Sequence, residues 1–312
     1  MNILPRFMYL FQSIPMFLPK SFFRLIDKRL SSFMWSNKHP RISRRFLQRQ
    51  REVGGLALPN LLYYYWAANL QKVVCLLQQP DVDWCQLELN ACRPSSLSAL
   101  IISKLPLSPK QHSSCPVVIS TLKIWSQFRQ HFNMTNFSIY SPICDNHVFL
   151  PSMLDPVFGQ WQRAGLSKFS DLYINGIFAT FDAISSKFSL QHSSLFRYLQ
   201  IRDFVRNISP CFPNLPPMGG MDILLQTPTH CRGLISKIYN SISSLNAVKL
   251  DEIRAEWSEE LGIHISDETW NHALHRVNGS TSCARLGLIQ FKVLHRIHYS
   301  RAQTLKDLFC SQ

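Results

Sequence analysis

The sequence of 312 residues predicts a mainly α-helical protein with a loop-rich middle and little strand. Apolar side chains recur at helical spacing over 22–34 and 286–297, and they surround almost the whole of 61–79. Prolines and serines crowd residues 80–120, which favours loops there. At roughly 150 residues per domain, this length allows two domains or one large domain with insertions.

The first helix is expected to begin near 19–21. Its predicted buried face is the row Phe22, Phe23, Ile26, Leu30, Phe33 and Met34. Ser43 is a candidate N-cap for a short helix over 44–51 that ends at Gly54-Gly55. The long helix over 61–79 is expected to be buried, because apolar residues cover nearly all its faces.

In the middle of the chain, short helices are expected over 120–132 and 156–165. The periodicity over 172–184 fits either a helix or a strand. Prolines at both ends of 210–220, with Gly219-Gly220 after them, predict a linker.

Near the carboxyl end, helices are expected over 234–246 and 250–261, the second ended by Gly262. A further helix is expected to start at Ser266, with Ile265 and Trp270 spaced as a hydrophobic staple. The last helix is expected over about 283–302. Its predicted apolar row is Leu286, Ile289, Val293 and Ile297.

The charge is unevenly distributed. The chain has 33 Lys and Arg against 19 Asp and Glu, a net charge of +14. Residues 1–52 carry +9, residues 272–306 carry +6, and the rest of the chain carries −1. This excess predicts a polyanionic partner, either nucleic acid or an anionic membrane surface. It argues against an acidic scaffold and against a small neutral metabolic enzyme.

The cysteines favour a reduced, intracellular protein. There are nine, at irregular spacings and without a CxxC pair, which predicts buried thiols and no disulfide framework. The apolar opening is interrupted by Pro5, Arg6 and Pro15 and has no small-residue cleavage site, which argues against a signal peptide. No run of 18 apolar residues occurs, so no membrane span is expected.

Two stretches carry a family resemblance. The first, within 1–79, contains MNILPRFMYLFQSIPMFLPKSFF, LSSFMW, PRIS and GGLALPNLLYYYWAANLQ, and the second contains LGIHISDETW and CARLGLIQFKVLHRIHYS. Together they resemble the part of a LINE-type (non-LTR) retrotransposon polyprotein that follows its reverse transcriptase catalytic core. The resemblance is close over roughly the first 80 and the last 60 residues, and the middle matches only in order and length. The combination of motifs in this order is the specific signal.

The resemblance implies a thumb-like helical module over 1–80, a mixed, loop-rich region over 81–220 and a helical module over 221–312. In that family, this region grips primer–template and template RNA. The implied partners are therefore RNA or an RNA–DNA hybrid and the palm domain of the parent polyprotein. Met1 is then expected to be an internal residue of a longer polyprotein.

The departures from the family predict a chain without catalysis. Polymerisation needs paired carboxylates that hold two metal ions about 4 Å apart, and the chain has no Asp-Asp dipeptide. The family's endonuclease domain is absent, and its Cys/His cluster would follow where only Ser311 and Gln312 come after Cys310. We therefore expect no enzyme activity, no cofactor, no metal and no small-molecule substrate.

The candidate nucleic-acid contacts are two groups of basic residues that could neutralise successive phosphates. They are Lys20, Arg24, Lys28, Arg41, Arg44 and Arg45 near the amino end, and Arg285, Lys292 and Arg296 near the carboxyl end. The alternative for both groups is an ordinary solvated surface. On that alternative the chain is a structural or interaction protein, or a relic reading frame with no specific role.

Other motifs have ordinary explanations. The run 63–66 (Tyr-Tyr-Tyr-Trp) could stack on bases, but four adjacent helical residues point four ways, so core packing is favoured. His295 and His298 lack a third metal ligand, and the spacing of Cys75, Cys85 and Cys92 does not fit zinc. The glycine pairs lack the Lys and Ser/Thr of a phosphate loop, and no GxSxG elbow occurs.

Overall fold

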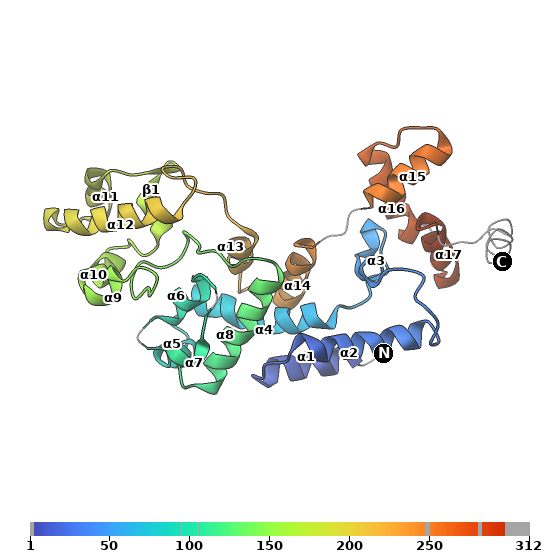
Figure 1. Ribbon diagram of the computed structural model, residues 1–312, viewed down its shortest axis with the longest axis horizontal. Coiled ribbons are helices and arrows are strands. Elements are labelled where there is room, and N and C mark those ends of the chain that lie inside the picture. Colours follow the sequence, from blue (N-terminus) through green and yellow to red (C-terminus); the bar gives the residue numbers. More distant parts are fainter. Residues whose placement is uncertain (1–2, 94, 106, 247–249, 280–282, 297–312) are drawn as a thin grey trace, which may run out of the picture. The chain divides into compact units, whose positions relative to one another are not determined.

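The computed structural model describes residues 3–93, 95–105, 107–246, 250–279 and 283–296 (Figure 1). Within these residues the chain forms seventeen α-helices and one two-stranded sheet, so the predicted mainly α fold is confirmed. The chain divides into two compact units. Unit 1 comprises 1–18 and 63–245, and unit 2 comprises 19–62 and 246–312. Each unit is built from two separate stretches, unlike the three successive regions expected from the sequence.

Unit 1 holds most of the short helices. They are α1 (Ile3–Ser13), α4 (Leu61–Gln78, in unit 1 from Tyr63), α5 (Asp83–Asn90), α6 (Leu97–Ile102), α7 (Pro109–His112), α8 (Pro116–His131), α9 (Pro151–Leu154), α10 (Val157–Arg163), α11 (Phe181–Phe188), α12 (Leu195–Ile208), α13 (Gly220–Leu225) and α14 (Leu234–Ser244). The sequence did not predict α1, whose Pro5 is tolerated because it lies in the first helical turn.

Aromatic side chains of α4 and α8 form one core of unit 1. Trp66 and Phe128 are fully buried with their ring centroids 5.7 Å apart, and the indole Nε1 of Trp66 donates to Gln127 Oε1 at 2.9 Å. Both helices were predicted, and α8 begins at Pro116 rather than at residue 120.

A buried arginine ties α8 to the chain around it. Arg129 is fully buried, and its guanidinium donates to four backbone carbonyls, those of Ile101, Ser103, Met134 and Asn136. Burial lowers the pKa of Arg129 to about 10, and the charge of Asp222 partly offsets this effect. A charge is tolerated here because hydrogen bonds replace its lost water.

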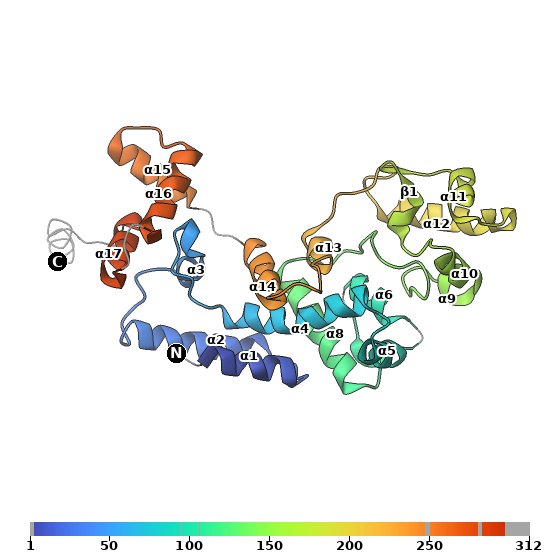
Figure 2. The ribbon, with the colours of Figure 1, turned by 180° about the vertical axis from the view of Figure 1, so that it is seen from behind.

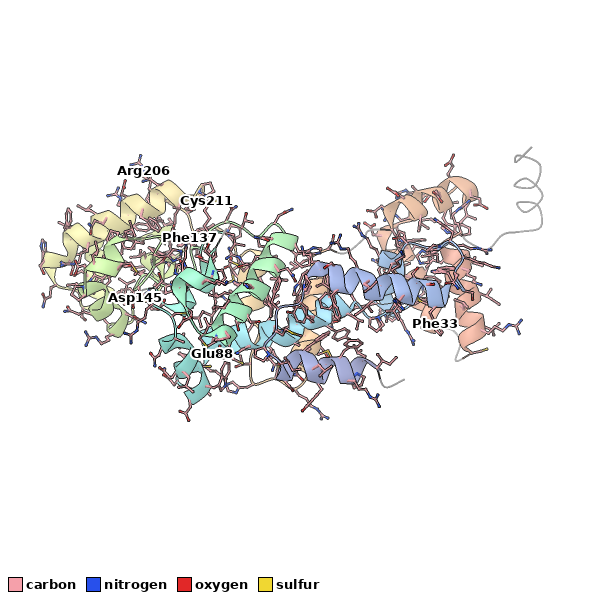
Figure 3. All side chains as sticks on the ribbon, turned by 60° about the horizontal axis from the view of Figure 1, so that its bottom comes forward. Phe33, Glu88, Phe137, Asp145, Arg206 and Cys211 are labelled. Atoms are coloured by element: carbon pink, nitrogen blue, oxygen red, sulfur yellow. The ribbon has the colours of Figure 1, made fainter. Side chains whose placement is uncertain are left out.

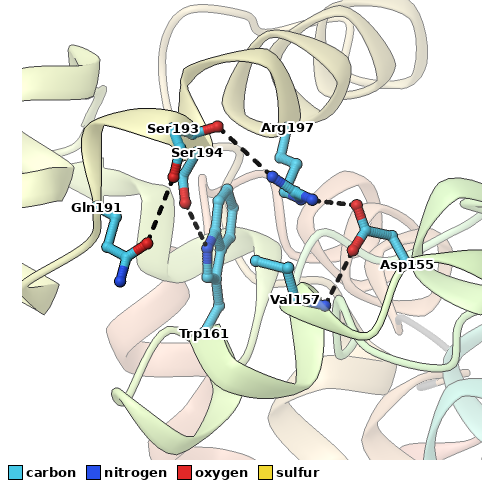
Figure 4. A network of polar contacts seen from close by, with 7 residues as sticks. All are labelled: Asp155, Val157, Trp161, Gln191, Ser193, Ser194 and Arg197. Carbon is cyan, nitrogen blue, oxygen red and sulfur yellow. Dashed lines mark hydrogen bonds and ion pairs between the residues drawn. The ribbon is translucent and has the colours of Figure 1, made fainter.

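The other core of unit 1 gathers α10, α11, α12 and the segments between them. Asp155 joins this region, because its carboxylate accepts from the Val157 N–H at 3.0 Å and from the Arg197 side chain at 2.6 Å (Figure 4). Trp161 Nε1 also donates to Ser194 Oγ at 3.4 Å. These contacts link the start of α10 to the start of α12.

A short hairpin resolves the ambiguous stretch 172–184. Strands β1 (Tyr173–Ile174) and β2 (Ile177–Phe178) pair antiparallel, with Asn175 and Gly176 both at positive φ in the turn, and α11 follows. An Asn-Gly pair is the preferred type I′ hairpin turn, because both residues tolerate positive φ.

The predicted linker at 210–220 is wrong. Asn214 bridges to Ile177 of the hairpin, Pro213 accepts from the N–H of Phe178, and Phe212 packs against the core. Proline lacks a donor, but its carbonyl still accepts hydrogen bonds, so a proline-rich segment can line a sheet edge.

The stretch 80–120 is also more regular than predicted. It contains α5, α6, α7 and the start of α8. In α6, five of the six residues are buried, and Ser96 caps the helix by accepting from the Ala99 N–H at 3.1 Å. Pro109 and Pro116 each begin a helix rather than belonging to one long loop.

Unit 2 contains α2 (Lys20–Met34), α3 (Arg44–Gln48), the 3₁₀ helix η1 (Arg51–Val53), α15 (Asp251–Leu261), α16 (Asp267–Gly279) and α17 (Ala284–Leu294). Its core joins the two stretches of chain. Phe291 of α17 packs with Ile42 and Leu47, and Leu250, Trp270, Leu274 and Leu294 pack with Phe46. Figures 1 and 2 show α3 beside α16 and α17 from both sides.

The glycine turn of the GGLALPN motif holds this packing. Gly54 has φ +80°, and a Cβ there would lie 2.8 Å from Leu274 Cδ2. A Cβ on Gly55 would lie 2.1 Å from the carbonyl oxygen of Arg49. These glycines form a turn, as expected, and leave room for helices of the carboxyl-terminal stretch.

The predicted end of α15 and the predicted start of α16 agree with the structure. Gly262 ends α15 at φ 63°, and Ser266 accepts from the Thr269 N–H at 3.2 Å at the start of α16. Ile265 and Trp270 both belong to the core cluster, as the predicted staple requires.

The predicted buried faces of the first and last helices are largely exposed. On α2 only Phe23 is buried, whereas Phe33 (labelled in Figure 3) is 84% exposed. On α17 the predicted row Leu286, Ile289 and Val293 is exposed, and Phe291 and Leu294 are buried instead. Ile297 lies outside the described residues.

Candidate nucleic-acid interface

All nine predicted contact residues lie in unit 2, although they come from opposite ends of the chain. Unit 2 has eighteen Lys and Arg and ten Asp and Glu, a net charge of +8. Its acids are concentrated on α15, whereas α2 has only Asp27 and α17 has none. Basic residues therefore predominate on α2 and α17, and acidic residues predominate on α15.

The basic stripe of α2 follows one face of the helix. Lys20, Arg24 and Lys28 are four residues apart and lie within about 80° of one another at 100° per residue. Arg24 and Lys28 are exposed and make no ion pair within the described part of the chain. The pKa of Lys20 is lowered by partial burial and by the neighbouring charge of Arg24.

Arg44 of the amino-terminal group pairs with Asp27. Its Nη2 lies 2.7 Å from Asp27 Oδ1, and its Nη1 donates to the Asp27 carbonyl at 2.9 Å. Burial lowers the pKa of Arg44, and the Asp27 carboxylate partly offsets this effect. Arg44 therefore joins α3 to α2, while its neighbours Arg41 and Arg45 are exposed.

On α17, Arg285 and Lys292 project away from the core. At 100° per residue they lie about 160–180° around the helix from Leu294, and both are exposed. Neither makes an ion pair among the residues that the structure describes. The exposed aliphatic residues Leu286, Ile289 and Val293 lie beside them on the same helix.

The expectation that the last helix continues through Arg296 is wrong. The helix ends at Leu294, and Arg296 has φ 54°. Its guanidinium pairs with Glu256 at 3.2 Å and Glu260 at 2.5 Å and lies 5.1 Å from the ring centre of Trp257. Arg296 is thus held against α15, away from the line of Arg285 and Lys292.

His295 accounts for the end of the helix. Its ring is buried, and Nε2 donates to the carbonyl of Gly54 at 2.8 Å, since a carbonyl can only accept. Burial lowers the pKa of His295, and the hydrogen bond to Gly54 partly offsets this. The residue anchors the carboxyl-terminal stretch to the glycine turn. His298 lies outside the described residues.

The aromatic run at 63–66 is internal, as favoured by the sequence. Tyr65 and Trp66 are buried, and Tyr63 stacks on Trp66 with ring centroids 5.7 Å apart. Tyr64 stacks on Tyr239 at 4.0 Å. The run therefore packs the protein rather than presenting a row of rings to bases.

The sequence did not predict a pocket of about 180 Å³ in unit 2, between the end of α2 and α3. Trp35 and Arg44 are among its lining residues. A cavity of larger volume, about 420 Å³, lies in unit 1. Lys72 and Glu88 both line it, and the charge of Lys72 is neutralised because its Nζ lies 2.5 Å from Glu88 Oε1.

Within the described ranges, no group of three or more His, Cys, Asp or Glu is placed to hold a metal ion. No helix there is long and apolar enough to cross a membrane. The sequence matches none of the known protein families with which it was compared. The resemblance to the LINE-type family stays a prediction.

Proposed function

We propose that unit 2 binds the phosphate backbone of RNA or of an RNA–DNA hybrid, and that the chain is a non-catalytic part of a LINE-type reverse transcriptase polyprotein. The observation that carries the proposal is that basic residues from both ends of the chain belong to one compact unit with a net charge of +8. Neutralising phosphates releases counterions, which gives affinity without sequence preference.

The pairing of charges identifies the strongest candidates. Arg24, Lys28, Arg45, Arg285 and Lys292 are exposed and have no carboxylate partner among the described residues. Arg44 and Arg296 already have partners, so their contribution to binding is expected to be smaller.

The test is a pair of charge reversals with a matched control. We expect Arg24→Glu with Lys28→Glu to weaken binding of a 12-nucleotide RNA and to lower the slope of log affinity against log salt by about 2. The control is Arg202→Glu with Arg206→Glu on α12 of unit 1, where two exposed arginines have the same spacing and the change in net charge is identical.

Fluorescence anisotropy between about 50 and 200 mM salt measures both the affinity and the slope. An equal loss in both double variants would mean that net charge alone attracts RNA, and the proposed site would be wrong. Absence of salt-dependent binding by the unaltered chain would contradict the function itself.

Exposed apolar side chains favour a second candidate, an interaction protein. Phe33 is 84% exposed and Leu25 is 55% exposed on α2. Such surfaces commonly rest on a partner, which for a LINE-type polyprotein would be the palm. If interaction is the only role, Phe33→Ser with Leu25→Ser should abolish self-association or partner binding, and the arginine reversals should change nothing.

A further inference from the structure

The 180 Å³ pocket of unit 2 has one apolar side, formed by Trp35, Met34 and Ile42. Trp35 is half-buried and packs against the cluster that contains Ile42 and Leu47. The pocket is smaller than the roughly 300–1,000 Å³ of sites for drug-sized ligands, so it suits a single ring system.

The rest of the pocket wall is polar. Ser31 and Ser43 contribute hydroxyls and Arg44 contributes its guanidinium. Arg44 Nε is buried and has no hydrogen-bond acceptor among the described residues, although the two terminal nitrogens contact Asp27. A buried N–H without an acceptor is costly, and an oxygen or ring nitrogen of a ligand would satisfy it.

The pocket continues the basic stripe of α2. Ser31 and Trp35 lie on the same helix face as Lys20, Arg24 and Lys28, all within about 80° of one another. Residues four apart are about 6 Å apart along the helix axis, comparable to the spacing of phosphates in an extended single strand. A strand that follows the stripe towards the end of α2 therefore reaches the pocket.

We infer that this pocket takes one unpaired base of single-stranded nucleic acid, whose phosphates follow Lys28 and Arg24. The inference rests on the proposed function and names its substrate more closely. Trp35 supplies an aromatic surface for the base, and Arg44 with the two serines donates to its polar edge. A base in a duplex is held by its pairing partner and cannot enter, so an unpaired stretch is required.

The test uses three probes of 12 nucleotides: oligouridylate, an abasic strand with the same phosphates, and a blunt duplex. We expect oligouridylate to bind at least about fivefold more tightly than the abasic strand. This ratio of affinities corresponds to one modest stacking contact between a base and an aromatic ring. The 2′-deoxy form of the first probe distinguishes an RNA ligand from a DNA ligand.

Two variants test the pocket itself. Trp35→Ala should reduce the affinity for oligouridylate to that for the abasic strand, and Trp35→Phe should retain most of the preference. Ser31→Leu fills the pocket without removing a core side chain and should have the same effect as Trp35→Ala. The matched control is Trp84→Ala, which alters a tryptophan of the cavity in unit 1.

The outcomes separate the two proposals. If the unaltered chain binds the abasic strand or the duplex as tightly as oligouridylate, the pocket does not take a base, although backbone binding stands. If Ser31→Leu, shown to be folded by circular dichroism, keeps the full preference, the inference is also overturned. If none of the probes binds, the proposed function fails.

Discussion

Arg129 of unit 1 and three arginines of unit 2 have opposite environments. In unit 1, Arg129 is fully buried, and its guanidinium donates to four backbone carbonyls. In unit 2, Arg24, Arg45 and Arg285 are exposed and have no carboxylate partner within the described part of the chain. The first arrangement stabilises a fold, and the second leaves cations available to a ligand.

The difference shows why net charge alone does not locate a binding surface. Burial determines whether an arginine can act on a partner, and neighbouring carboxylates determine how much charge remains. Arg296 has a third environment, because it is on the surface but held by two glutamates of α15. Arginines of equal formal charge therefore have different consequences in these three environments.

The largest expected effect is the loss of the buried guanidinium. Arg129→Met should destabilise unit 1 by about 3 kcal/mol or more, because four carbonyls lose their donor and those of Ile101 and Ser103 are buried. Urea unfolding followed by circular dichroism measures the change. The control Arg206→Met removes an exposed arginine of α12 (labelled in Figure 3) and should stay within about 0.5 kcal/mol of the unaltered chain. Equal effects would contradict the structural role of Arg129.

A smaller effect is expected at the glycine turn of unit 2. Gly55→Ala should destabilise this unit by about 1–3 kcal/mol, because the new Cβ would lie 2.1 Å from the Arg49 carbonyl oxygen. In unit 1, Gly159→Ala on α10 meets nothing within 4 Å and should be neutral or stabilising by up to about 1 kcal/mol. Thermal unfolding of both variants tests the contrast, and a stable Gly55→Ala protein would show that the turn can relax.

The smallest effect concerns two ion pairs with opposite dependence on pH. The hydrogen bond from Arg197 lowers the pKa of Asp155 in unit 1, whereas burial raises the pKa of Asp27 in unit 2 more than Arg44 lowers it. The unfolded value for both is about 3.9. Asp155 therefore stabilises the fold above that pH and loses its effect as pH falls through the lower folded value. The contribution of Asp27 is present below that pH and is lost as pH rises through its higher folded value.

Urea unfolding between pH 3 and pH 7 tests this difference. Asp155→Asn should cost less than about 1 kcal/mol at pH 7, and the cost should vanish towards pH 3. The stability of Asp27→Asn relative to the unaltered chain should increase with pH over the same range. The same slope in both variants would contradict the opposite signs.

Sequence periodicity predicted two kinds of helix. In one, apolar residues cover nearly all faces of the helix, and in the other they recur at helical spacing over several turns. Helices α4, α8 and α15 are of these kinds, and their ends agree with the structure to within a few residues. Periodicity also found the apolar face of α2, but it could not say what covers that face. The prediction that Phe33 lies in a helix is therefore confirmed, and the prediction that its side chain is buried is wrong.

Features that depend on distant residues were missed. The last helix ends at Leu294 because His295 bonds to Gly54, which is 241 positions away in sequence. The 180 Å³ pocket needs α2 and α3 to meet, and no local pattern encodes that meeting. The hairpin is different, because Asn175-Gly176 between apolar residues is a local turn signal that the sequence does contain.

The two-stretch construction of unit 2 has a consequence during synthesis on the ribosome. Residues 19–62 emerge first, and residues 63–245 must be translated before the chain from 246 onward can supply Trp270, Leu274 and Phe291. Translation adds about 5–20 residues per second. The apolar side chains of 42–58 therefore wait on the order of ten seconds or more for these partners. Nascent chains in this interval are expected to be chaperone clients. In unit 1, residues 1–18 wait a shorter time, because only residues 19–62 separate them from the start of its second stretch.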